Sequence, residues 1–103
     1  MKRMSHLQFL VVEDQSIIRQ FMAKELSKYG RVFEAENEVK AETILGNIKP
    51  DLAFIDLNLT DSDKYEGFDL IEACSQKGIP SVVLTGNEDQ DIIKEAYSRG
   101  AKQ

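Results

Sequence analysis

Four short apolar runs, each followed by a stretch of helical character, most constrain how this chain can fold. The runs lie at residues 9–12, 32–35, 52–55 and 81–84. Runs this short are typical of buried strands, because helices usually need about 10 residues or more. Strands that alternate with helices predict an α/β fold, in which a doubly wound parallel sheet carries helices on both faces. The connections between the strands should be right-handed.

Apolar residues at helical spacing predict a helix after each strand. The four sets are Ile17, Ile18, Phe21, Met22 and Leu26; Ala41, Ile44, Leu45 and Ile48; Leu70, Ile71 and Cys74; and Ile92, Ile93, Ala96 and Tyr97. We expect the first helix to end at Gly30, in the left-handed conformation that glycine adopts easily. Pro50 and Gly78 should end the second and third helices. The strand at 32–35 is less apolar than the others, so we place it at a sheet edge.

Composition excludes several classes of function. The 103 residues provide a single domain, which we take to span 1–103. The net charge of −5 argues against nucleic-acid binding through this domain, because phosphate neutralisation needs clustered Lys and Arg. No apolar run approaches the ~20 residues that span a bilayer, and the basic start lacks a signal-peptide cleavage site. We therefore expect a cytoplasmic protein without membrane association, in which Cys74 is a small buried apolar residue rather than a nucleophile.

Polar residues that can carry chemistry follow three of the predicted strands. Glu13 and Asp14 follow the first strand, Asp56 follows the third, and Thr85 follows the fourth. The carboxyl ends of parallel strands meet at one edge of a sheet, so these side chains should converge if the three strands are neighbours. Carboxylates this close raise one another's pKa unless a cation neutralises them, and Mg²⁺ prefers such oxygen ligands. The alternative is that the aspartates only cap the following loops or helices.

Four segments in this order resemble the CheY-like receiver domain of two-component response regulators. FLVVEDQSIIRQ is similar to the first strand of that family with its acidic pair, and PDLAFIDLNL to the strand that carries the phosphorylated aspartate. IPSVVLTGNED is similar to the strand that carries a Thr or Ser, and EAYSRGA to the end of the fourth helix. The resemblance covers essentially the whole chain.

The resemblance implies a phospho-acceptor in a phosphorelay, rather than an enzyme, with Mg²⁺ as cofactor. Asp56 would accept a phosphoryl group from a histidine kinase or a phosphotransfer protein, or from small donors, and would lose it by autodephosphorylation. The other implied site residues are Asp14 as a direct Mg²⁺ ligand together with Asp56, the backbone carbonyl of Asn58 as a further ligand, Glu13 as a ligand through a water, Thr85 as the phosphoryl contact and switch, and Gly86 at the mouth of the site. The effector and the pathway stay unspecified.

The sequence departs from the family pattern in two places. In the loop after the acceptor, Thr60 and Lys64 stand where the family has a Pro and a Gly, and Gly67 indicates an insertion. The family's phosphate-binding lysine would fall beyond Gln103, because Lys102 comes too early to be that residue. We therefore expect a receiver truncated after the fourth helix, without the fifth strand and helix.

That truncation has two expected consequences. The strand at 81–84 becomes an exposed edge, which predicts self-association or a domain swap. Phosphorylation should also be impaired, because a charge-assisted contact with the phosphoryl group is missing.

Two other functions stay open at this point. A Mg²⁺-dependent phosphatase of the haloacid-dehalogenase type also uses an aspartate at a strand end, and FIDLNLT resembles its motif. Asn58 stands in place of that family's second aspartate, however, and an amide cannot replace a general acid. A docking module that is never phosphorylated is the other alternative. A flavodoxin-like FMN site is disfavoured, because the turn after 9–12 lacks a phosphate cradle.

Overall fold

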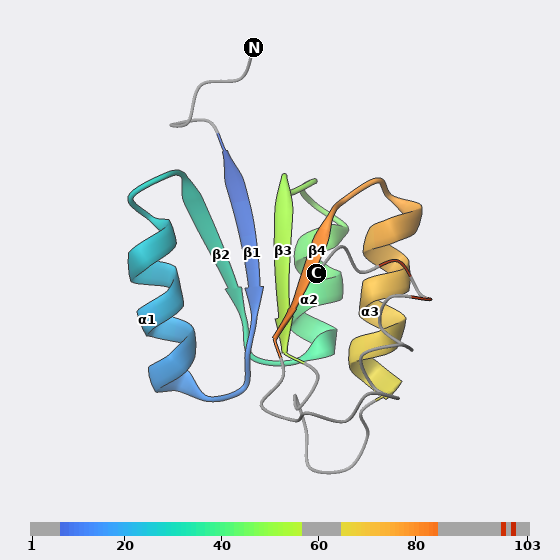
Figure 1. Cartoon of the computed structure of the whole chain (residues 1–103), viewed down its shortest axis with the longest axis horizontal. Helices are drawn as coiled ribbons and strands as arrows, with labels where there is room; N and C mark the ends of the chain where they lie inside the picture. The colour runs from blue at the N-terminus through green and yellow to red at the C-terminus, as the bar shows by residue number, and fades with distance from the viewer. Residues whose placement is uncertain (1–6, 57–64, 85–97, 99, 101–103) are drawn as a thin grey trace.

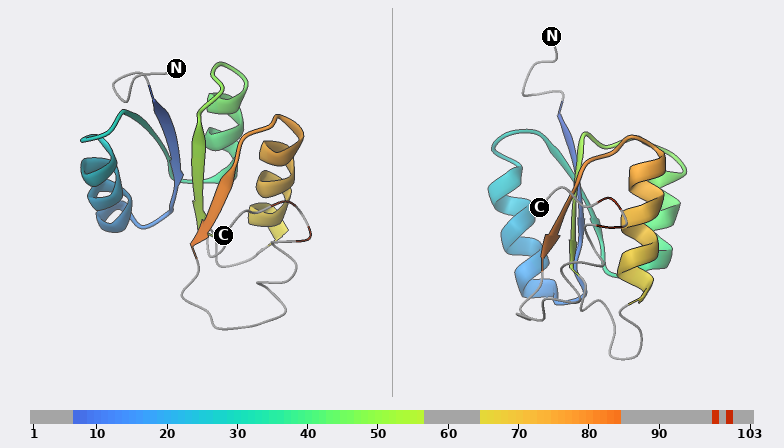
Figure 2. Two further views of the ribbon diagram at one scale, coloured as in Figure 1. Left: turned by 45° about the horizontal axis from the view of Figure 1, so that its top comes forward. Right: turned by 45° about the vertical axis from the view of Figure 1, so that its right-hand side comes forward.

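The structure is a computed structural model that describes residues 7–56, 65–84, 98 and 100. In chain order, its elements are β1 (Gln8–Val12), α1 (Ser16–Leu26), β2 (Arg31–Ala35), α2 (Glu38–Leu45), β3 (Leu52–Asp56), α3 (Tyr65–Gln76) and β4 (Ser81–Leu84). They form three layers, with α1 on one face of a sheet and α2 and α3 on the other (Figures 1 and 2). The α/β class predicted from the sequence is therefore confirmed. The helix expected around 92–97 lies outside the described residues.

The described sheet has the order β2-β1-β3-β4, and all of its pairs are parallel. The strand at 32–35 is thus at an edge, as its weaker apolar character predicted. The first, third and fourth strands are neighbours, which is the arrangement that the predicted convergence of acids requires. The chain moves outward from β1 to β2 on one side and from β3 to β4 on the other. The carboxyl ends of β1 and β3 therefore flank the point where the strand order reverses, where open α/β sheets place their ligand sites.

The main core lies between the sheet and the two helices α2 and α3. Leu10 on β1 and Ile55 on β3 are fully buried there, and so are Leu70, Ile71 and Cys74 on α3. Burial also raises the pKa of the Cys74 thiol to about 11. The prediction that Cys74 is a buried apolar residue rather than a nucleophile agrees with both observations, because the thiolate is the reactive form.

The two glycines Gly78 and Gly30 play different structural roles. Gly78 follows α3 with a φ of +73°, which agrees with its predicted role as a helix stop. The prediction that Gly30 forms a left-handed cap at the end of the first helix is wrong, because α1 already ends at Leu26 and Gly30 has no positive φ. A side chain at Gly30 would instead come within 2.5 Å of the carbonyl oxygen of Leu7. That oxygen accepts a hydrogen bond from the backbone of Arg31, so the close approach belongs to the start of the β1–β2 pair.

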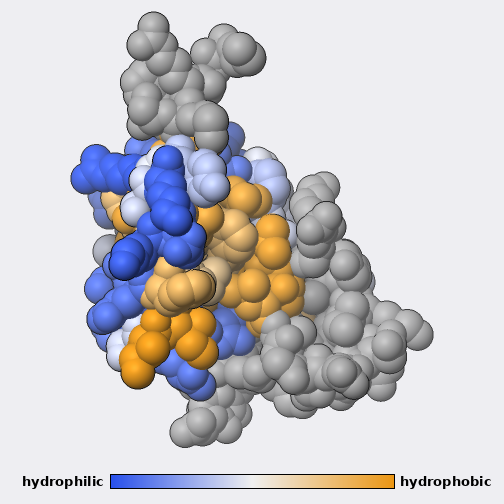
Figure 3. Space-filling view, turned by 60° about the vertical axis from the view of Figure 1, so that its left-hand side comes forward, coloured by the Kyte–Doolittle hydropathy of each residue, from blue (hydrophilic) through white to orange (hydrophobic). Residues whose placement is uncertain are grey.

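The helix α1 packs less deeply than its sequence pattern suggests. None of its residues is fully buried, and Ile17 and Phe21 are 81% and 65% exposed. Figure 3, which looks onto the α1 side of the molecule, shows apolar side chains at this surface. Within the described residues, no helix has the length and apolar character needed to cross a bilayer.

Candidate functional site

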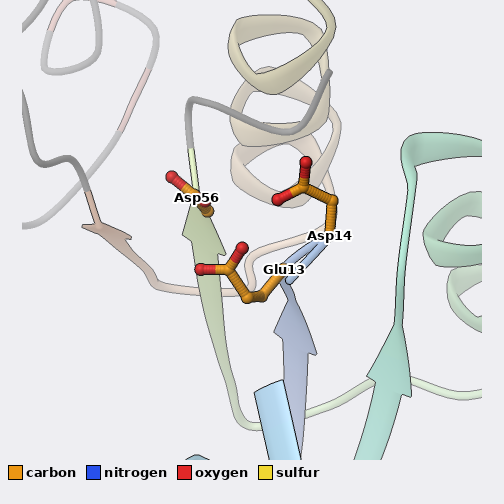
Figure 4. Close-up of side chains that lie close together, drawn as sticks. All are labelled: Glu13, Asp14 and Asp56. Carbon is orange, nitrogen blue, oxygen red and sulfur yellow. The ribbon is translucent and has the colours of Figure 1, made fainter. Parts of the chain in front are cut away.

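Three carboxyl groups meet at the carboxyl edge of the sheet, as the sequence predicted. Glu13 and Asp14 directly follow β1, and Asp56 is the last residue of β3. Val12 pairs with Ile55 in the register of these two parallel strands, so the acids come next at the same level. One carboxylate oxygen from each residue lies within 4.8 Å of the others. Figure 4 shows the three side chains gathered around the ends of β1 and β3.

The three acids differ in their access to solvent. Glu13 and Asp56 are buried, with only 4% and 8% of their surfaces exposed. Asp14 is exposed. We call the cluster of these three residues the acidic pocket; Glu13 and Asp56 are its buried members and Asp14 is its exposed member.

Within the described residues, the surroundings of Glu13 favour its protonated form. Burial raises the pKa of Glu13 to about 7, and hydrogen bonding with the carboxyl groups of Asp56 and Asp14 also favours its protonated form. The backbone N–H of Gln15 opposes this shift by donating to Glu13 Oε2 at 3.1 Å. A pKa raised in this way is what burial and neighbouring carboxyl groups produce.

A hard divalent cation would offset the negative charge of the three carboxyl groups. Glu13, Asp14 and Asp56 each offer a carboxylate oxygen, which is a type of ligand that Mg²⁺ and Ca²⁺ take in proteins. These three oxygens lie close enough to bind one ion. The residues present therefore fit the Mg²⁺ that the sequence predicted.

The capping alternative does not explain Asp14. The N-cap of α1 is Gln15, and no side chain caps that helix end by a hydrogen bond. The remaining predicted site residues, Asn58, Thr85 and Gly86, lie outside the described residues. The described strand that precedes Thr85 ends at Leu84, which is the register partner of Asp56.

One contact at the edge was not predicted from the sequence. Arg19, on α1, donates from Nη1 to the backbone carbonyl of Glu13 at 2.9 Å. The only signal for it was an arginine in the first turns of the helix after the acidic pair, and helical spacing alone did not show that this side chain turns back toward the pocket.

Comparison with known proteins agrees with this geometry. Residues 9–103 match the family model of the response regulator receiver domain. The chain is similar to the KDP operon transcriptional regulatory protein KdpE of Escherichia coli K12, with 35% identity over 94 residues that cover 89% of this chain and 40% of KdpE. It is also similar to the virulence transcriptional regulatory protein PhoP of Salmonella typhimurium LT2, with 35% identity over 98 residues that cover 92% of this chain and 42% of PhoP.

Solved structures give the same result. A response regulator from Burkholderia pseudomallei, with a phosphorylated aspartic acid, a calcium ion and citrate, has a TM-score of 0.83 and 26% identity, covering 93% of this chain and 56% of that chain. A response regulator from Thermotoga maritima has a TM-score of 0.80 and 27% identity, covering 93% of this chain and 80% of that chain.

The chain spans about two fifths of the length of the curated relatives KdpE and PhoP. Phosphorylation and Mg²⁺ binding at an acidic pocket are general features of the matched family, whose members act as phospho-acceptors in two-component systems. The parallel α/β fold, the acidic pocket at the carboxyl edge and the match over residues 9–103 agree with one another. The chain therefore belongs to the CheY-like receiver domains of response regulators.

Proposed function

We propose that Asp56 accepts a phosphoryl group from a phosphohistidine of a histidine kinase or a phosphotransfer protein, in a pocket that binds Mg²⁺. The observation that carries this proposal is the meeting of Glu13, Asp14 and Asp56, with one carboxylate oxygen of each within 4.8 Å of the others. The similar structure from Burkholderia pseudomallei, which contains a phosphorylated aspartic acid and a calcium ion, supports it.

The three acids suit different roles in this reaction. Asp14 and Asp56 would bind Mg²⁺ directly, with the backbone carbonyl of Asn58 as a further ligand, and Glu13 would act through a water. Glu13 is the less suitable acceptor, because its pKa is raised to about 7 and its Oε2 already accepts a hydrogen bond from Gln15. Asp56, which the resemblance to the family implies as the acceptor, supplies the nucleophile in this proposal.

The transfer itself needs little covalent help from the protein. A carboxylate oxygen of Asp56 attacks the phosphorus, the bond from phosphorus to the imidazole nitrogen breaks, and the donor histidine keeps the electron pair and takes up a proton. When Mg²⁺ is bound, it offsets the negative charge that gathers on the phosphoryl oxygens. Thr85 would donate its hydroxyl to one of these oxygens, and Gly86 would keep the mouth of the pocket open.

The donor protein would also cover the surface beside the pocket. Ile17 and Phe21 are exposed on the first two turns of α1, which begins two residues after Asp14. A protein that brings a histidine to Asp56 would bury these apolar side chains, which supports a protein donor in addition to a small one.

Intact-mass measurement after incubation with acetyl phosphate and Mg²⁺ tests the proposal directly. We expect a Mg²⁺-dependent gain of one phosphoryl group in the wild-type chain and none in Asp56→Asn. The matched control is Asp69→Asn, which changes an exposed aspartate on α3 and should be phosphorylated like the wild type. An adduct that persists in Asp56→Asn would contradict the assignment of the acceptor. Steady turnover of a phosphate ester would favour the haloacid-dehalogenase alternative instead.

A further inference from the structure

Arg19 is a charged residue whose side chain is mostly removed from solvent, with 15% of its surface exposed. Charged side chains are rarely buried this far unless they are paired. Arg19 has two partners, one directly after β1 and one on β2. Its Nη1 donates to the backbone carbonyl of Glu13 at 2.9 Å, and its Nε lies 3.3 Å from Oε1 of Glu34 on β2. The planar guanidinium allows both contacts to form at once.

The carbonyl that Arg19 holds is the one between the two acidic residues. It belongs to the peptide group that joins Glu13 to Asp14, so its orientation is coupled to the directions of both side chains. On its other side, the backbone N–H of Glu13 donates to the carbonyl of Ala35 at 3.0 Å. The backbone of Glu13 is therefore tied to β2 through Ala35 and to α1 through Arg19, directly beneath the acidic pocket.

We infer that Arg19 is a positioning residue for the divalent cation, acting through the backbone of Glu13 and braced by Glu34. This inference rests on the proposed function, because it requires that the acidic pocket binds Mg²⁺. Mg²⁺ demands near-ideal octahedral geometry, so a small displacement of its carboxylate ligands weakens its binding. Residues that hold metal ligands in place commonly affect metal affinity almost as strongly as the ligands do.

The sign of the effect separates positioning from simple electrostatics. The guanidinium of Arg19 is positively charged and donates a hydrogen bond to the backbone carbonyl of Glu13. If it acted on the pocket only through its charge, it would repel Mg²⁺, and its removal would tighten binding. If it positions the ligands, its removal weakens binding. The two explanations therefore predict opposite changes in the dissociation constant for Mg²⁺.

The test is a Mg²⁺ titration of the full chain, followed by the backbone amide signals of residues 13–15 in NMR spectra. We expect Arg19→Ala to raise the dissociation constant roughly 10-fold. Arg19→Lys keeps the positive charge but cannot contact Glu13 and Glu34 with separate guanidinium nitrogens, so its affinity for Mg²⁺ should lie between those of Arg19→Ala and the wild type. Glu34→Gln leaves Arg19 in place and removes its ion pair with Glu34, so it should weaken Mg²⁺ binding by a smaller factor.

The matched control is Arg31→Ala, which removes an exposed positive charge from the far end of β2, where the side chain lies over the Phe33 ring. That variant should keep the wild-type affinity.

The outcomes separate a failure of the proposed function from a failure of the role inferred for Arg19. If wild type does not bind Mg²⁺, the proposed function fails and the role of Arg19 fails with it. If wild type binds Mg²⁺ and Arg19→Ala binds it as tightly or more tightly, the role of Arg19 is overturned and the proposed function stands. An equal loss in Arg31→Ala would also overturn it, because that effect could not come from the Glu13 carbonyl. If Arg19→Ala does not fold, Arg19→Lys and Glu34→Gln carry the test, and unchanged affinity in both contradicts the inference.

Discussion

The helices α1 and α3 lie on opposite faces of the same sheet, and each carries an apolar stripe that its sequence predicts (Figure 2). In α3, Leu70, Ile71 and Cys74 are fully buried in the core. In α1, no residue is fully buried, and Ile17 and Phe21 are exposed. Similar local patterns therefore lead to different degrees of burial.

The difference shows where each helix contributes. Burial of the α3 stripe removes apolar surface from water and stabilises the fold. The helix α1 instead follows the Glu13-Asp14 pair directly and holds its carbonyl through Arg19. Its packing contributes less to stability, and its position matters for the pocket and for the surface next to it. The following four predictions test this contrast.

The largest expected effect comes from removing one buried isoleucine side chain. Ile71→Ala should lower the free energy of unfolding by about 2–5 kcal/mol, because it leaves a cavity in the core. Ile17→Ala makes the same chemical change on an exposed helical position and should change stability by no more than about 0.5 kcal/mol. Urea denaturation of the two variants measures both. Equal losses would show that the α1 stripe is buried in solution, and the contrast between the helices would be wrong.

The acidic turn before α1 should make stability depend on pH. The pKa of Glu13 is raised from 4.5 to about 7 in the folded state, by burial first and then by hydrogen bonding with Asp56 and Asp14. Between these values the folded state binds more protons than the unfolded state, so this contribution is complete below pH 4.5 and is lost as the pH rises through 7. We expect a loss of roughly 1–2 kcal/mol, less than the full shift implies, because the pocket is open to solvent at Asp14.

Denaturation of the metal-free protein at pH 5 and pH 8 measures this loss. Glu13→Gln should remove most of the difference between the two pH values. Glu72→Gln, at an exposed position on α3, should keep the wild-type difference. If Glu13→Gln retains the full pH dependence, another group is responsible for it.

Mg²⁺ should stabilise the folded state by binding only to the assembled pocket. At ten times the dissociation constant, the expected gain is about 1.4 kcal/mol. Asp56→Asn should lose most of this gain, whereas Ile17→Ala should keep it, because that side chain is exposed on α1 and is not one of the pocket acids. Thermal unfolding with and without Mg²⁺ provides the measurement. A similar gain in Asp56→Asn would place the ion elsewhere.

The smallest expected effect concerns the exposed surface of α1. The donor in this test is a phosphohistidine protein that phosphorylates the wild type. Phe21→Ser should make phosphoryl transfer from this donor roughly 5-fold slower, which corresponds to a loss of about 1 kcal/mol of interaction free energy. Labelling by acetyl phosphate should not change, because that donor is too small to reach Phe21. The control is Val39→Ser, which alters an exposed apolar residue on α2. A slower reaction with acetyl phosphate as well would show that Phe21→Ser disturbs the pocket itself.

Sequence patterns by themselves determined the order of the elements along the chain and placed the acids at the carboxyl ends of strands, whereas the order β2-β1-β3-β4 that brings them together came from the tertiary structure. Alternating apolar runs and helical spacing are local signals, and a parallel α/β sheet with helices on both faces is the arrangement that fits them. Once Glu13, Asp14 and Asp56 follow neighbouring parallel strands, their convergence is a consequence of strand direction. Helical spacing likewise placed Leu70, Ile71 and Cys74 on one face of a helix.

Tertiary structure alone decided which of these patterns are covered and how the pocket is held. Helical spacing places Ile17 and Phe21 on one helix, but it cannot say whether a neighbour covers them. Gly30 is required by the approach of Leu7, a contact between segments far apart in the chain. The same holds for Arg19, whose partners come from the end of β1 and from β2. These features depend on distances between elements, and a pattern along one element contains no information about such distances.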